Sequence, residues 1–229
     1  MIIQGLQKIT LLDFPGKVAC TVFTRGCNFR CPFCQNALLV TDIDLSEYIP
    51  EDEFFSYLEK RTGVLDGVCI TGGEPLINKD IADFIKKIKA LGFAVKLDTN
   101  GSFPDRLKEL LDQNLLDYVA MDIKSSIDRY EQAVGIKFDT ESIFASVNIL
   151  KNSGIDHEFR TTVTKELHDT KTICDIAAFI GKGEKWYLQQ YKESDNMVGD
   201  IMTAYSEDEM KQLQIAASAI HSETFLRGI

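Results

Sequence analysis

The sequence predicts an α/β protein built around a parallel β-sheet, and three observations support this prediction. Short apolar, β-branched segments recur at regular intervals through the middle of the chain. Each segment is followed by a turn and then by a stretch with amphipathic helical periodicity. The segments are apolar along nearly their whole length, as is typical of strands that are buried on both faces. Six such units favour an open partial (β/α)6 TIM-like barrel or a doubly wound sheet, because a closed barrel of this type needs eight.

The strands expected from this pattern are residues 17–24, 66–71, 93–99, 117–124, 157–164 and 185–191. The residues up to Pro15 are predicted to form a short N-terminal extension, which could be a hairpin.

The helices expected between and after these strands are residues 51–61, 79–91, 105–113, 141–154, 170–183 and 207–221. Several of their ends are marked by residues that commonly start or stop helices. Asn78 is a candidate N-cap for the second helix and Gly92 a candidate stop. Pro104 suits the first turn of the third helix. Ser206 and Glu209 have the spacing of a capping box at the start of the last.

Length and composition predict a single domain over residues 1–229, with a core at about 15–192 and a C-terminal loop and helix at 193–229. The first residues do not resemble a secretory signal, and no apolar segment approaches the ~20 residues that span a bilayer. We therefore expect a cytoplasmic protein whose thiols stay reduced. The net charge of −10 argues against nucleic acid as a partner, and we expect no membrane partner either.

The most informative stretch is RGCNFRCPFCQN, in which Cys27, Cys31 and Cys34 follow the first predicted strand with C-x3-C-x2-C spacing. The thiols could be unrelated. They could bind zinc with a distant fourth ligand, for which the candidates are Cys20, Cys69 and His157. They could also bind a [4Fe–4S] cluster through three thiolates, which would leave one iron open. Because an open position is typical of catalytic metal sites, the third interpretation predicts an enzyme.

Other polar motifs also lie where a predicted strand ends. They are TGGEP at 71–75, LDTNG at 97–101, MDIK at 121–124, RTTVT at 160–164 and LQQYK at 188–192. The carboxyl ends of parallel strands meet at one edge of the sheet, where ligands bind. We therefore expect these motifs to share one site with the cysteines.

CNFRCPFC resembles the C-x3-C-x-aromatic-C motif of the radical S-adenosylmethionine (SAM) enzymes, with Phe33 in the aromatic position. The resemblance covers roughly residues 8–192, and LLDFPGKVACTVFTRGCNFRCPFCQN is similar to the branch that activates glycyl radical enzymes. It implies that Cys27, Cys31 and Cys34 hold a [4Fe–4S] cluster and that SAM chelates the open iron. The reduced cluster would then cleave SAM to methionine and a 5′-deoxyadenosyl radical.

The resemblance also assigns roles to residues at the other strand ends. Gly72, Gly73 and Glu74 would receive the amino end of SAM, since glycines allow close approach and a carboxylate or free carbonyl can accept from an ammonium group. Lys124 would pair with the SAM carboxylate. Phe33 would pack near the adenine, or would exclude water from the cluster.

Two carboxylates at neighbouring strand ends, Asp98 and Asp122, would repel each other unless a cation lies between them. The resemblance implies a monovalent cation held by Asp98, Thr99 and Asp122 beside SAM. Alternatively, Asp98 only orders the DTNG turn. Arg160 would face SAM, or form a structural buried ion pair.

The last predicted strand offers two candidates for SAM contact, Gln190 and Lys192, and the sequence does not choose between them. The substrate implied by the resemblance is a backbone glycine of a partner glycyl radical enzyme. LLDFPGK, together with Gln35 where some pyruvate formate-lyase activases have histidine, favours anaerobic ribonucleoside-triphosphate reductase as that partner. A flavodoxin or ferredoxin would supply the electron. The alternatives are a radical SAM enzyme acting on a small molecule or peptide, and a non-catalytic iron–sulfur or zinc module.

Overall fold

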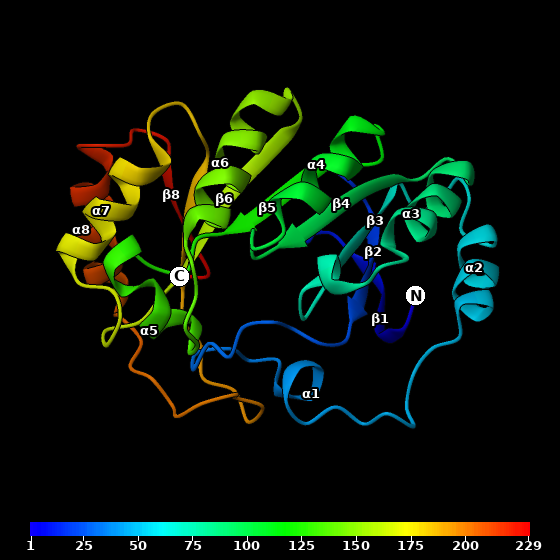
Figure 1. The fold of residues 1–229 in the computed structure, drawn as a ribbon, viewed down its shortest axis with the longest axis horizontal. Helices are drawn as coiled ribbons and strands as arrows, with labels where there is room; N and C mark the ends of the chain where they lie inside the picture. The colour runs from blue at the N-terminus through cyan, green and yellow to red at the C-terminus, as the bar shows by residue number, and fades with distance from the viewer.

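The structure, a computed structural model, describes all residues from 1 to 229, and it contains one eight-stranded sheet (Figure 1). The strands follow chain order across the sheet: β1 (Ile3–Thr10), β2 (Ala19–Thr24), β3 (Gly67–Gly72), β4 (Ala94–Thr99), β5 (Tyr118–Asp122), β6 (Asp156–Val163), β7 (Trp186–Gln190) and β8 (Thr224–Arg227). β1 pairs antiparallel with β2, and every later pair is parallel. Because β1 and β8 do not pair, the barrel stays open, which confirms the predicted partial barrel.

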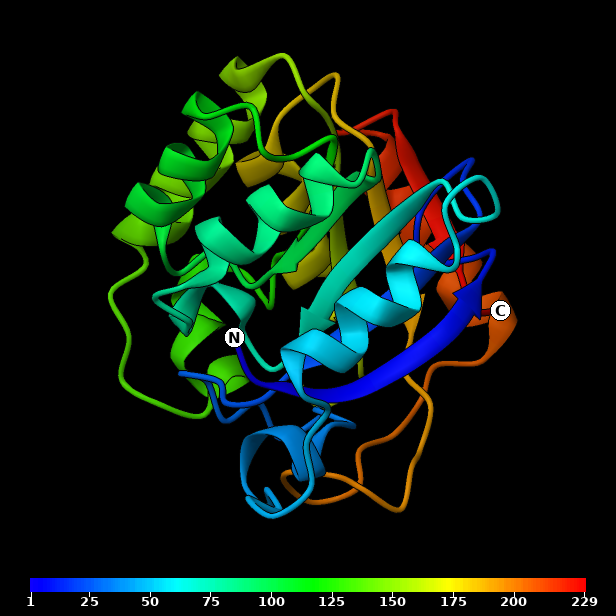
Figure 2. The same ribbon diagram turned by 90° about the vertical axis from the view of Figure 1, so that its right-hand side faces the viewer.

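Helices cover the outer face of this curved sheet (Figures 1 and 2). The helices of the chain are α1 (Ala37–Val40), α2 (Glu51–Glu59), α3 (Ile81–Ala90), α4 (Pro104–Asp112), α5 (Tyr130–Val134), α6 (Glu141–Ser153), α7 (Thr170–Ile180) and α8 (Glu207–Ser218), with 3-10 turns η1 (Pro75–Ile77) and η2 (Ile127–Arg129). Figure 1 shows α3, α4, α6, α7 and α8 in a row along the sheet, whereas the short α1 and α5 lie near the edge where the parallel strands end. All six predicted helices are present.

The two faces of the sheet differ in chemistry, and this corrects one expectation. The outer face and the helices enclose a core cluster of 45 buried residues, to which β5 contributes Val119 and Met121. Side chains alternate along a strand, so Tyr118, Ala120 and Asp122 point to the inner face instead. The inner face carries buried charges such as Lys96 and Glu158. The sequence pattern suggested strands that are apolar on both faces, whereas in the structure only the outer face is apolar.

Phe14 closes the end of the barrel opposite the ends of the parallel strands. It lies in the connection between β1 and β2, is 2% exposed, and packs its ring 6.2 Å from the ring of Tyr118. A Cβ atom on Gly67 would lie 2.9 Å from the Phe14 ring, so the glycine makes room for it. The N-terminal extension thus holds one strand, β1, which forms a hairpin with β2, and the connection between them covers this end of the barrel.

The sequence signals for helix ends agree with the structure at Pro104, which begins α4, and at Gly92, which follows the end of α3 with φ of +88°. They also agree at Ser206 but not at Asn78. Ser206 and Glu209 form the expected capping box at the start of α8. Asn78 was wrongly predicted to cap α3: the N-cap is Asp80, and the Asn78 amide donates to the Pro75 carbonyl at 3.0 Å. The strand β8 was not predicted either. No helix combines the length and the hydrophobicity that crossing a bilayer requires.

Candidate active site

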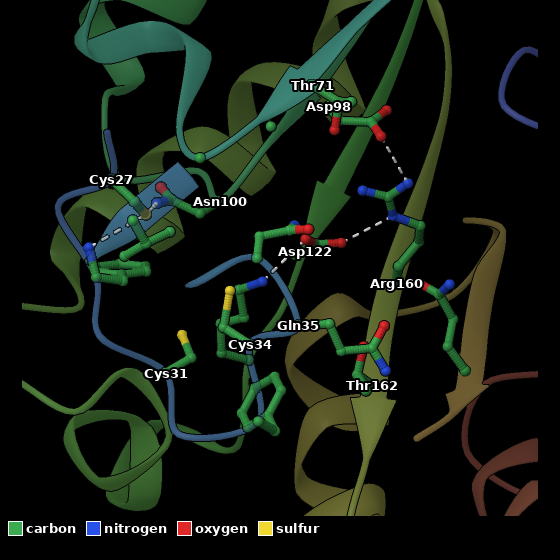
Figure 3. Close-up of a pocket in the computed structure, with 18 of the residues that line it drawn as sticks. Cys27, Cys31, Cys34, Gln35, Thr71, Asp98, Asn100, Asp122, Arg160 and Thr162 are labelled. Atoms are coloured by element: carbon green, nitrogen blue, oxygen red, sulfur yellow. Dashed lines mark hydrogen bonds and ion pairs between the residues drawn. The ribbon is translucent and has the colours of Figure 1, made fainter. Parts of the chain in front are cut away.

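A cavity of about 430 Å³ lies at the carboxyl ends of the parallel strands, where the sequence placed the site. Cys27, Cys31 and Cys34 lie along one side of it, and a row of charged groups on β4, β5 and β6 lies along the other (Figure 3). The predicted residues that line the cavity are Cys27, Cys31, Phe33, Cys34, Gly72, Gly73, Asp98, Thr99, Asp122, Lys124, Arg160, Gln190 and Lys192. The expected convergence of the motifs is therefore present, with one exception, Glu74.

The cysteine loop runs from β2 to α1 and brings its three thiols to the same cavity. Burial raises the pKa of the Cys31 thiol to about 12, although the Lys124 charge acts to lower it. Burial also raises the pKa of Cys27, whose sulfur accepts a hydrogen bond from the Phe29 N–H at 3.4 Å. Since metal ligands must be thiolates, loading a metal here releases protons, and positive charge from the metal is needed to hold the thiolates.

This donor set does not fit zinc but fits an iron–sulfur cluster with an open iron. The three candidates for a fourth zinc ligand, Cys20, Cys69 and His157, do not line the cavity. No three His, Cys, Asp or Glu side chains are grouped as a single metal ion would require. Three thiols around a cavity that also contains polar groups leave space for a cluster and for a further ligand on it.

The glycines of TGGEP are required by close backbone contact with the cysteine loop. Gly72 has φ of +117°, and a Cβ atom on it would lie 2.3 Å from the Thr24 carbonyl oxygen. A Cβ atom on Gly73 would lie 1.9 Å from the Gly26 carbonyl oxygen. The N–H groups of Gly73 and Glu74 donate to Thr24 and Gly26 at 2.9 and 2.8 Å. The end of β3 is thereby fixed against the loop that carries the cysteines.

Glu74 does not reach the cavity, which corrects its expected role as a direct SAM ligand. Its side chain is fully buried and accepts from the Leu76 N–H at 3.0 Å, the Thr99 hydroxyl at 2.8 Å and the Asn100 N–H at 2.6 Å. Burial raises the pKa of this carboxyl group to about 7 against the effect of these donors. Glu74 therefore joins the ends of β3 and β4, and only backbone groups of Gly72 and Gly73 remain to face a ligand.

Arg160 lies between the two aspartates that the sequence placed at neighbouring strand ends. Its Nε donates to Asp122 Oδ1 at 2.8 Å, and its Nη1 donates to Asp98 Oδ2 at 3.1 Å (Figure 3). Lys124 Nζ contacts the other oxygen of Asp122 at 2.9 Å. Burial acts to raise the pKa of both aspartates, but the Arg160 charge, with Lys96 at Asp98 and Lys124 at Asp122, holds both below the usual range. Arg160 thus forms the buried ion pairs that were one of its two predicted roles, and it also lines the cavity.

The remaining predicted residues are partly occupied by contacts within the protein. The Gln190 amide donates to the Tyr205 carbonyl at 2.7 Å, and the backbone carbonyl of Lys192 accepts from the Gln35 amide. Phe33 is buried, with its ring 6.3 Å from that of His168 in an edge-on arrangement. Gln190 and Lys192 both line the cavity, so the structure does not choose between them as a contact for SAM.

Several positions that contact the cysteine loop were missed in the sequence. Asn100 donates to Asn28 Oδ1 at 3.0 Å and lies 3.8 Å from the sulfur of Cys27. The segment 193–205 crosses the cysteine loop, since the Val198 N–H donates to the Cys34 carbonyl at 2.9 Å and the Ala37 N–H donates to Asn196 at 3.0 Å. Asn100 lies in the DTNG motif, so the sequence did contain a signal for it. The backbone contacts of the 193–205 segment join residues distant in the chain and leave no pattern in the local sequence.

His168 was also missed, and it fixes the backbone of Lys124. Its Nδ1 accepts from the Thr164 N–H at 3.1 Å, so its Nε2 carries the proton and donates to the Lys124 carbonyl at 2.9 Å. Burial lowers the pKa of His168 to about 4, against the effect of both hydrogen bonds.

Because the pKa of His168 is lower in the folded state than in the unfolded chain, its contribution to stability is present above pH 6.5 and is lost as the pH falls toward 4. Lowering the pH from 7 to 5 should cost roughly 2 kcal/mol of unfolding free energy from this residue alone. We expect His168→Gln to reduce the pH dependence by that amount in urea unfolding of the cluster-free protein. Equal pH slopes for the variant and the wild type would show that His168 is not held neutral.

Comparison with known proteins identifies the family. The family model described as "Radical SAM superfamily" matches residues 21–180, which include all three cysteines and the ends of β2 to β6. The chain belongs to the radical SAM superfamily. It is therefore an enzyme of the radical SAM type, and its cofactors are a [4Fe–4S] cluster and SAM. The donor set described above fits this cluster.

Individual proteins are similar to the chain over different extents. A Methanocaldococcus jannaschii protein named "Putative glycyl-radical enzyme activating enzyme MJ1227" is 30% identical over 199 residues, which are 85% of this chain and 81% of that protein. The GTP 3′,8-cyclase of Helicobacter pylori is 31% identical over 159 residues, 66% of this chain and 48% of the cyclase.

The fold of the chain resembles that of solved radical SAM structures. The crystal structure of Streptococcus suis SuiB bound to S-adenosylmethionine superposes with a TM-score of 0.68 at 16% identity, and it covers 91% of this chain and 52% of SuiB. The chain thus spans about half the length of SuiB and of the cyclase, and this likeness to SuiB shows the fold alone.

Proposed function

We propose that this radical SAM enzyme activates a glycyl radical enzyme by removing a hydrogen atom from a backbone glycine of that partner. The observation that carries the proposal is the similarity to MJ1227, which extends over 85% of this chain and 81% of that protein. The similarity to the cyclase reaches only 48% of the cyclase.

In this proposal, Cys27, Cys31 and Cys34 hold the cluster through their thiolates and leave one iron for SAM. When bound, the cluster and SAM together supply the electron transfer and C–S cleavage that give methionine and a 5′-deoxyadenosyl radical. The backbone of Gly72 and Gly73 lines the cavity beside the cysteine loop, where a carbonyl can accept from the SAM ammonium group.

The charged row and the aromatic residue would orient the rest of SAM. Lys124 lies in the cavity with one carboxylate partner, Asp122, so its ammonium group has further donors for the SAM carboxylate. Arg160 and Gln190 line the same cavity, and Phe33 forms an apolar part of its wall. Excluding water at this wall would protect both the cluster and the radical.

For the partner, we propose anaerobic ribonucleoside-triphosphate reductase, with a flavodoxin or ferredoxin as electron donor and the cytoplasm as the setting. LLDFPGK and Gln35 support the choice of this reductase. The structure gives LLDFPGK a structural reason as well, because Phe14 within it closes the barrel. The formal net charge of −10 also suits a protein partner better than nucleic acid.

The test is glycyl radical formation on that reductase, detected by electron paramagnetic resonance after anaerobic incubation with reconstituted, reduced enzyme and SAM. We expect a radical signal that requires both proteins and SAM. A reductase whose radical glycine is replaced by alanine is the matched control.

One observation favours a second candidate, a small-molecule substrate. The 31% identity to the cyclase over 159 residues is as high as the identity to MJ1227. Incubation with GTP in place of the reductase tests this candidate. Consumption of GTP together with 5′-deoxyadenosine formation, without any protein radical, would replace the activase proposal.

A further inference from the structure

The paired carboxylates in the cavity already have cationic partners supplied by the chain. Lys96 Nζ contacts Asp98 Oδ1, and Arg160 contacts Asp98 Oδ2 at 3.1 Å. Arg160 contacts Asp122 Oδ1 at 2.8 Å, and Lys124 contacts Asp122 Oδ2 at 2.9 Å. Each of the four carboxylate oxygens therefore has a side-chain cation, and three positive charges face two negative ones.

The third residue expected at a cation site, Thr99, is also occupied. Its side chain is buried, and its hydroxyl donates to Glu74 Oε1 at 2.8 Å. The same oxygen accepts from the Gly101 N–H at 3.2 Å. Asp98, Thr99 and Asp122 consequently do not fit the monovalent cation that the family resemblance implied.

Lys96 is the residue that occupies the Asp98 oxygen where a monovalent cation would otherwise bind. Its side chain is only 3% exposed and rises from the inner face of β4, two residues before Asp98. Its ammonium group lies 6.0 Å from the centre of the Tyr118 ring and 3.8 Å from the sulfur of Cys69. Enclosed in this way, it cannot turn to solvent, so its charge is a fixed part of the site.

We propose that Lys96, together with Arg160, takes the place of a bound monovalent cation at Asp98 and Asp122, so that the SAM site of this enzyme needs no Na⁺ or K⁺. A further cation would find no free carboxylate oxygen on Asp98 or Asp122, because each already contacts a side-chain cation in a site where water screens charge poorly. Lys96 is on this account a positioning residue: it holds Asp98, which holds Arg160. The inference rests on the proposed SAM site, but not on the identity of the partner.

The first test uses the wild-type, cluster-loaded protein under anaerobic conditions. Its thermal unfolding midpoint and its SAM affinity are measured in NaCl, KCl and tetramethylammonium chloride at equal ionic strength. We expect the midpoint to differ by less than about 2 °C among the salts, and the SAM dissociation constant to be the same within about twofold. A saturable gain in either quantity with Na⁺ or K⁺ alone would overturn the proposal.

The second test removes the internal cation with Lys96→Met, which keeps most of the side-chain length. In tetramethylammonium chloride, the variant leaves one oxygen of a buried carboxylate unpaired, and its midpoint should fall by roughly 6–15 °C. Na⁺ can then bind at the freed oxygen, and it should restore about half of the loss or more. Lys108→Met, which removes a surface lysine paired with Asp112, should show no such dependence.

The double variant Lys96→Met with Asp98→Asn separates a specific site from a general salt effect. Without the Asp98 carboxylate, there is no oxygen anion for Na⁺ to bind, and the salt response of Lys96→Met should disappear. Rescue by Na⁺ that persists in the double variant would contradict the proposal. These readouts need no partner protein, so a failure here is distinct from a failure of the activase proposal.

Discussion

Replacing Cys31 with alanine should abolish both cluster binding and SAM cleavage. Cys31 is the most deeply buried of the three thiols, and a cluster that lost it would keep two protein ligands in a cavity that offers no substitute cysteine. Mutation of residues that only support metal ligands lowers metal affinity or activity by about 10–100-fold. Loss of a ligand itself should therefore reduce product formation by at least about 100-fold. Iron and sulfide content after anaerobic reconstitution, and the cluster absorbance, give the direct measurements.

Cys174→Ala provides the matched control for that variant. Cys174 lies in α7, outside the cavity, and its thiol has a hydrogen-bond contact with the Ala216 carbonyl oxygen at 3.9 Å. It should keep full iron content and activity. Wild-type iron content in Cys31→Ala would mean that the cluster is held elsewhere, and the assignment of the cysteine loop would fail.

Arg160→Met should destabilise the protein by about 3–5 kcal/mol and weaken SAM binding as well. Arg160 is the only cation that contacts both Asp98 and Asp122. Without it, the two carboxylates keep one lysine each but lose the group that separates their charges in a largely buried site. Urea unfolding measures the stability, and equilibrium dialysis with SAM measures the binding.

Arg129→Met tests whether the cost comes from the buried network and not from loss of an arginine in general. Arg129 forms a partly exposed pair with Asp169 at 3.4 Å, and such pairs contribute about 1 kcal/mol or less. It also donates to the Leu167 carbonyl at 3.3 Å and the Thr172 hydroxyl at 3.2 Å, so the control includes lost hydrogen bonds as well as a lost charge. If Arg160→Met were no more destabilising than Arg129→Met, the charged row would not be a structural unit.

The parts of the fold that were predictable from the sequence are those specified by local patterns. The strands from β2 to β7, the helices after them and the capping box at Ser206 each depend on neighbouring residues. The cysteine spacing and the placing of polar motifs after strands were enough to predict one shared site. This worked because parallel strands bring their carboxyl ends to the same edge of the sheet.

The parts that were not predictable depend on contacts between residues distant in the chain. Glu74 appeared to be a cavity ligand, but Thr99 and Asn100 from β4 and the loop that follows it draw its carboxylate into the protein. Glu158 and Arg227, two charges inside the barrel, were missed because they pair across strands that are far apart in the chain. Glu158 on β6 makes a bidentate contact with Arg227 on β8 at 2.7 and 2.9 Å. The four-residue strand β8 is too short to show a pattern of its own.

Radical cleavage of SAM at this site is tested most directly by the yield of 5′-deoxyadenosine. Anaerobically reconstituted enzyme, reduced with dithionite and incubated with SAM, should form 5′-deoxyadenosine and methionine in equal amounts, and Cys31→Ala should form neither. The same mixture is also measured with the partner reductase added, because the enzyme could require its bound substrate before it cleaves SAM. No 5′-deoxyadenosine from a fully loaded, reduced cluster, with or without the reductase or GTP, would contradict the account.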